Sequence, residues 1–138
     1  MAEERQNKDR WLDAVTHMIA LTQQRKLEWR PAFLVELPRH DDRVSAVLIS
    51  EFNDRKLRLY SRRVELPKPD PFTEAIYESR HQTAPRSALA IELEFIDDKG
   101  ASLWNFPSVA ALKDLLLAAQ YQSAGVKDFL AEIEALAS

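Results

Sequence analysis

The sequence predicts an α+β domain in which an antiparallel sheet of about five strands is covered by an N-terminal helix and two C-terminal helices. Near both ends of the chain, apolar residues recur every three or four positions, which is typical of amphipathic helices. The middle holds shorter runs rich in branched and aromatic residues, separated by turn-forming residues. This order of patterns favours strands packed beneath terminal helices.

The chain has 138 residues, of which 46% are hydrophobic and 30% are charged. That length can bury a core without disulfides, so one domain spanning residues 1–138 is predicted, with residues 1–8 flexible. The absence of cysteine excludes disulfides, thiolate metal sites and thiol nucleophiles. The polar N-terminus and the lack of a long apolar stretch predict a cytoplasmic protein that does not bind membranes.

The first helix is expected over residues 9–26, and Pro31 keeps the chain extended after it. Strands are expected over residues 33–37, 43–52 and 56–66, with a turn at Asn53 and Asp54. In the third run the apolar residues change parity after Leu59, so a bulge is expected near residues 61–63.

Residues 67–87 form a long connection, in which a short helix is predicted with Asp70 as its cap and Pro71 in its first turn. The rest of this connection is expected to be a mobile loop. Strands are predicted over residues 88–97 and 101–106, joined by a turn that contains Gly100. Two amphipathic helices follow, with Gly125 between them.

Trp104 and Phe106 lie two positions apart, so both side chains face the same side of the last strand. Pro107 is expected to end that strand, and Ser108 to cap the helix that follows. We interpret the two aromatic residues as a hinge into the core rather than a ligand platform. On this interpretation, Trp104→Ala removes a buried ring and strongly destabilises the fold.

Catalytic, cofactor and metal motifs are missing from the sequence. The three histidines lack a second ligand at the spacing of zinc sites, and two glycines are too few for a phosphate-binding loop. Glu92 and Glu94 match the solvated face of a strand rather than an acid–base pair. A non-enzyme without cofactor is therefore predicted, with an enzyme of unrecognised type as an alternative.

A basic run over residues 55–63 combines positive charges with an aromatic residue, a pattern found in nucleic-acid interfaces. The net charge of −3 counts against that use, and arginines also protect edge strands from aggregation. The candidate surface for a protein partner or nucleic acid comprises Arg55, Lys56, Arg58, Tyr60, Arg62, Arg63, Arg80 and His81.

Charge is unevenly distributed along the chain. Residues 39–68 contain eight Lys or Arg against five Asp or Glu, a balance of +3, whereas residues 92–138 contain three against eight, a balance of −5. We interpret this division as an ordinary solvated surface, because individual surface ion pairs contribute little. The alternative is a bipolar surface that recognises charged partners or its own copies.

Residues 56–60, 91–100, 104–108 and 121–130 resemble a group of small uncharacterised bacterial proteins with a Phe-Pro junction and a C-terminal helix pair. The expected element order is also similar to that of the small acidic chaperones of bacterial type III secretion, which are homodimers that bind unfolded effector segments. With catalytic and metal motifs missing, we predict a non-catalytic, protein-binding bacterial domain, and the chaperone-like element order implies a homodimer. A nucleic-acid-associated regulatory protein is the alternative.

Overall fold

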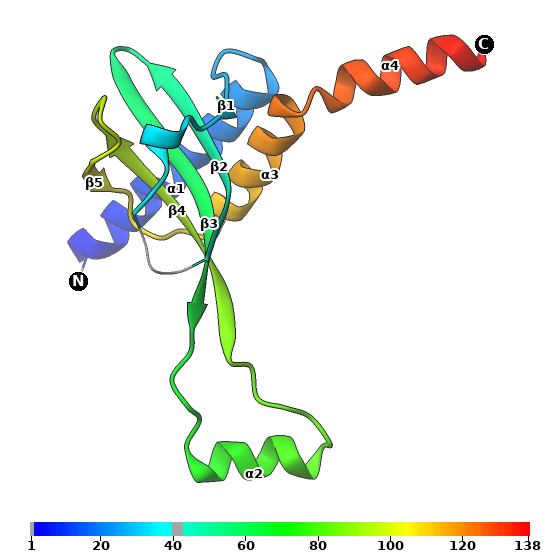
Figure 1. Ribbon diagram of the computed structural model, residues 1–138. Coiled ribbons are helices and arrows are strands. Elements are labelled where there is room, and N and C mark those ends of the chain that lie inside the picture. The colour runs from blue at the N-terminus through cyan, green and yellow to red at the C-terminus, as the bar shows by residue number, and fades with distance from the viewer. Residues whose placement is uncertain (1, 40–42) are drawn as a thin grey trace.

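The computed structural model describes residues 2–39 and 43–138, with side chains from residue 8 onward. It has the predicted α+β class, with five antiparallel strands in the order β1-β2-β3-β4-β5 (Figure 1). The elements are α1 (Ala2–Gln23), β1 (Arg30–Pro31), a 3₁₀ turn η1 (Leu34–Glu36), β2 (Arg43–Phe52), β3 (Arg55–Glu65), α2 (Pro71–Ser79), β4 (Ser87–Ile96), β5 (Ser102–Asn105), α3 (Ala111–Ser123) and α4 (Val126–Ala137).

The core lies between one face of the sheet and the helices α1 and α3, which lie side by side behind it in Figure 1. Leu57 and Leu59 of β3 point toward these helices, as expected for alternate residues of a strand. The buried core residues are Val15, Leu27, Trp29, Leu48, Leu57, Leu59, Leu93, Leu112, Leu115, Leu116 and Ala119. Burying each large side chain contributes about 1.5–3 kcal/mol, so this layer supplies most of the hydrophobic free energy that favours folding.

The helices depart from expectation at the two ends of the chain. The first helix begins at Ala2, so residues 2–8 are helical. At the other end, α3 covers the sheet, whereas α4 extends away from the body of the molecule (Figure 1). Its apolar stripe is therefore exposed instead of adding to the core.

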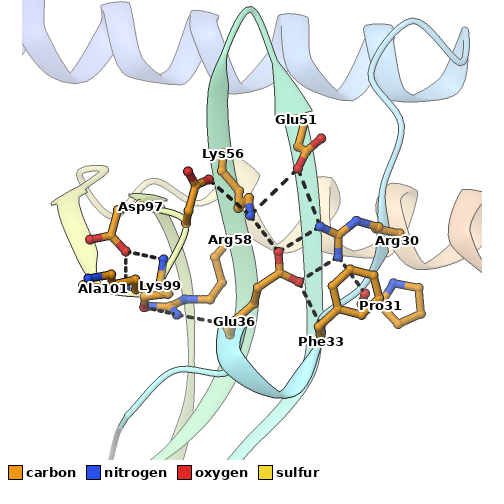
Figure 2. Close-up of polar contacts among 12 residues, drawn as sticks. Arg30, Pro31, Phe33, Glu36, Glu51, Lys56, Arg58, Asp97, Lys99 and Ala101 are labelled. Atoms are coloured by element: carbon orange, nitrogen blue, oxygen red, sulfur yellow. Dashed lines mark hydrogen bonds and ion pairs between the residues drawn. The ribbon is translucent and has the colours of Figure 1, made fainter.

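The strand predicted over residues 33–37 is wrong. This segment contains the 3₁₀ turn η1, and the edge strand β1 is the preceding Arg30–Pro31. The turn closes because the carboxylate of Glu36 accepts a hydrogen bond from the backbone N–H of Phe33 at 2.8 Å. We call residues 32–38 the strap, since they cross the sheet face opposite α1 and α3 (Figure 2).

The predicted bulge exists, but it lies on β2 rather than near residues 61–63 of β3. The pairing of β2 with β3 shifts between Ser45 and Leu48, and Ala46 adopts a positive φ of 53°. By contrast, β3 pairs continuously with β4 from Lys56↔Ile96 to Glu65↔Ser87. The extra residue therefore interrupts the pairing of β2 with β3 and leaves the pairing of β3 with β4 regular.

Beyond the Arg43↔Arg63 pair, β3 and β4 continue as a two-stranded ribbon with α2 at its end (Figure 1). We call residues 63–89 the arm. The predicted cap of α2 is confirmed, because Asp70 accepts the backbone N–H of Thr73 at 2.7 Å and Pro71 occupies the first turn. No residue of α2 is buried by the described part of the chain.

The aromatic hinge is only partly as expected. Trp104 and Phe106 contact each other and Trp11 of α1, with ring centroids 5.1–5.4 Å apart, and Phe95 joins the cluster. However, Trp104 remains 44% exposed. The predicted Ser108 cap is also wrong, because α3 begins at Ala111 with Ala110 in the cap position and no side-chain cap bond.

Partial exposure changes the expected cost of removing Trp104. We expect Trp104→Ala to cost about 1–2 kcal/mol, below the roughly 3–5 kcal/mol of a fully buried large aromatic residue. Urea unfolding at 25 °C measures this difference. The control is Leu103→Ala on the same strand, where the side chain is 65% exposed and the cost should be within about 0.5 kcal/mol. A loss as large as that of a buried ring would contradict the exposed geometry.

Candidate functional site

The strap is anchored by one buried carboxylate, that of Glu36, which is 1% exposed (Figure 2). Arg30 donates two hydrogen bonds to it, Nη1 to Oε1 and Nη2 to Oε2, both at 2.8 Å. Lys56 approaches Oε2 at 3.1 Å. Such paired, charge-assisted bonds are stronger and more directional than neutral ones, so they fix the position of the 3₁₀ turn.

A second buried charge, Arg58, joins the strap to the turn between β4 and β5. Its Nε donates to Oε1 of Glu94 at 2.6 Å, and its Nη1 donates to the carbonyls of Glu36 at 2.9 Å and Gly100 at 2.8 Å. Gly100 has a φ of +82°, and a side chain there would collide with the carbonyl of Val35. The strap therefore fits against this turn only because glycine occupies the position.

We call Arg30, Glu36 and Lys56 the clamp, because their opposite charges hold the strap against the sheet. The hydrogen bond from Arg30, helped by the Phe33 N–H and Lys56, lowers the pKa of Glu36 to about 2 despite its burial. Burial, reinforced by Glu94 and Glu92, raises the pKa of the Tyr60 phenol above its ordinary value. At neutral pH Glu36 is thus a carboxylate with its oxygens already bonded, and Tyr60 keeps its proton.

The clamp holds apolar side chains outward. On the strap Phe33 is 63% exposed, Leu34 86%, Val35 55% and Leu37 38%. In an ordinary loop the apolar residues face the protein and the carboxylate faces water, which is the reverse of this arrangement. A fixed, exposed apolar group of this kind is typical of a surface that contacts another molecule.

The predicted surface residues do not form one patch. Arg58 and Tyr60 are 3% and 1% exposed, so they belong to the interior, and β3 is a central strand rather than an edge. The carboxylate of Glu94, expected in solvent, is also buried because it pairs with Arg58. Arg58 is covered by the strap and by the β4–β5 turn, because it donates to the carbonyls of Glu36 and Gly100.

The other predicted residues are divided among five places. Lys56 belongs to the Glu36 clamp, with only 16% of its side chain exposed. Arg62 pairs with Glu92 at 3.1 Å on the sheet. The exposed members are separated: Arg55 is at the β2–β3 turn, Arg63 is at the base of the arm, and Arg80 and His81 follow α2.

Sequence reasoning missed Arg30, Glu36 and Glu94 as a connected set. One signal was present, since Glu36 is a lone carboxylate within an apolar run, and such a residue needs a specific partner if it is buried. Arg30 lies only six positions before Glu36, but Lys56 and Arg58 lie 20 or more positions after it, so the complete set could not be found from a local pattern.

Further apolar surfaces remain exposed away from the strap. In the arm the exposed residues are Leu66, Phe72, Ile76 and Leu89, and on α4 they are Phe129, Leu130, Ile133 and Leu136. A groove of about 260 Å³ between α1 and the β2–β3 hairpin is lined by Met18, Leu21, Leu27, Phe52, Arg55, Leu57, Phe95 and Phe106. These surfaces are suited to apolar contacts with other proteins rather than to acid–base chemistry.

Comparison of the chain with protein-family models, curated proteins and solved structures finds no match. Within residues 2–39 and 43–138, no helix is long and apolar enough to cross a membrane. The same residues bring together no group of three or more His, Asp or Glu side chains suited to hold a metal ion.

Proposed function

We propose that this chain is a non-catalytic protein-binding domain that acts as a homodimer, paired through its arm. The observation that carries the proposal is the exposure of α2, which is held away from the core at the end of a two-stranded ribbon. A helix of this length is marginal in water without packing, so a partner surface would stabilise it. The resemblance in element order to homodimeric type III secretion chaperones agrees with this proposal.

The arm has the apolar residues that an interface needs. Phe72 and Ile76 lie one turn apart on α2 and are 76% and 38% exposed, and on the strands Leu66 is 41% and Leu89 61% exposed. In a two-fold dimer each copy contributes the same patch, so these side chains would meet their counterparts. Burying them removes the largest apolar area of the arm from water.

The charges of the arm also complement themselves. Its helix carries Glu74 and Glu78 and is followed by Arg80, whereas the ribbon and its base carry Arg43, Arg63, Lys68 and Arg86 against two acids, Glu65 and Asp70. An antiparallel pairing of two arms places the acidic helix of one copy along the basic strands of the other. Such complementarity fixes orientation and excludes pairings that bring like charges together.

Light scattering at micromolar concentration tests the pairing. We expect the wild-type chain to be a dimer and Phe72→Ser/Ile76→Ser to be a monomer with the same far-UV circular dichroism, because the substituted residues contribute nothing to the core. The matched control is Phe33→Ser/Leu34→Ser in the strap, which should remain a dimer. A monomeric wild type, or equal dissociation of both variants, would contradict the proposal that the arm forms the dimer interface.

The wider role is tested by affinity purification from the cell of origin. A protein-binding domain should be recovered with a second protein in stoichiometric amount, and that recovery should depend on exposed apolar residues of this chain. Repeated recovery of the bare domain would contradict the proposal.

A further inference from the structure

The helix α4 presents an apolar stripe that the described chain leaves open. Phe129 is 58% exposed, Leu130 46%, Ile133 47% and Leu136 84%. Figure 1 shows the helix leaving the end of α3 and extending away from the sheet. Gly125, with a φ of +67°, precedes the helix, and an exposed contact of 3.5 Å joins Arg25 to Asp128. The stripe therefore faces solvent in the described chain.

Acidic residues border this stripe. At 100° per residue, the apolar side chains cover about a third of the helix circumference, with Glu132 beyond one edge and Glu134 beyond the other. Asp128 is already in contact with Arg25 at 3.5 Å, whereas Glu132 and Glu134 form no ion pair with the described residues. A cation from another molecule would pair with these two carboxylates and lie next to the apolar stripe.

Two other occupants are disfavoured by the same charges. Each copy of α4 carries one lysine against three acids, a charge of −2, so pairing two copies brings like charges together. The twelve residues of α4 also give less than two full heptads of contact. Interfacial membrane helices carry Lys and Arg on the polar face, whereas anionic lipid repels this one.

We propose that α4 docks with a segment of another protein that is apolar along one face and flanked by Lys or Arg. The apolar residues of that segment cover Phe129 and Ile133, and its cations meet Glu132 and Glu134. The inference rests on the proposed protein-binding function and names the partner class. It is independent of the arm, which lies at the opposite end of the molecule (Figure 1).

Fluorescence anisotropy with a labelled amphipathic peptide of leucine and lysine, about four helical turns long, tests this partner class. We expect saturable binding at physiological salt and none for the matched leucine–glutamate peptide. Glu132→Lys/Glu134→Lys should weaken binding of the lysine peptide roughly tenfold and create binding of the glutamate peptide. Phe129→Ser/Ile133→Ser should abolish binding of the lysine peptide.

The matched charge control is Asp9→Lys/Asp13→Lys on α1, two exposed acids one turn apart that should leave binding of the lysine peptide unchanged. Equal weakening by this control, or no binding by the wild type, would overturn the proposal. Light scattering on the same samples separates it from the arm dimer: the α4 variants should remain dimers, and Phe72→Ser/Ile76→Ser should still bind the peptide.

Discussion

Replacing Arg58 with alanine is expected to lower the free energy of unfolding by roughly 3–5 kcal/mol, the usual cost of breaking a buried ion pair. Arg58 is 3% exposed, and its removal leaves the buried carboxylate of Glu94 without its cation. It also leaves the carbonyls of Glu36 and Gly100 without this donor. Because these groups belong to the strap and to the β4–β5 turn, both should loosen. Urea unfolding measures the loss.

The control for Arg58 is Arg63→Ala, on the same strand but exposed, with an expected effect within about 0.5 kcal/mol. A double variant, Arg58→Met/Glu94→Met, should be more stable than either single variant, because it removes both buried charges together. If Arg58→Ala cost no more than Arg63→Ala, the buried pair would not hold the two segments together.

The parts of the fold that could be predicted are those where neighbouring residues alone determine the local structure. The apolar residues of α3 recur with a period of 3.6 residues, which predicts a helix with one buried face. Leu112, Leu115, Leu116 and Ala119 are indeed buried. Likewise, the alternation of Leu57 and Leu59 specifies a strand with one face buried. The cap of α2 follows from Asp70 and Pro71 alone.

The parts that could not be predicted depend on contacts between distant segments. Alternation on β3 shows that Arg58 and Tyr60 share a face, but not that this face is covered. Arg58 is covered by two distant segments, the strap and the β4–β5 turn, and the strap resembles a strand because four of residues 33–37 are apolar. The same limit applies to α4, whose stripe predicts a packed helix whether the packing comes from its own chain or from another.

Replacing Glu36 with glutamine is expected to cost on the order of 2–3 kcal/mol at pH 7, because Arg30 and Lys56 lose the carboxylate that they share. The shape of the side chain is kept, so the change removes charge rather than volume. The matched control is Glu51→Gln, whose carboxylate contacts the same two cations from an exposed position and should contribute under about 1 kcal/mol.

The difference in stability between wild type and Glu36→Gln should depend on pH in a defined direction. The pKa of Glu36 falls from 4.5 to about 2 on folding, because Arg30, the Phe33 N–H and Lys56 favour the carboxylate. A lowered carboxyl pKa stabilises the folded state fully above the unfolded pKa, and this contribution is lost as pH falls toward the folded value. The two proteins should therefore differ most above pH 4.5 and converge as pH approaches 2. Because the other carboxyl groups titrate in both proteins, the difference isolates Glu36. A gap that stayed constant through this range would show that the strap is held by the shape of its turn rather than by the charge of Glu36.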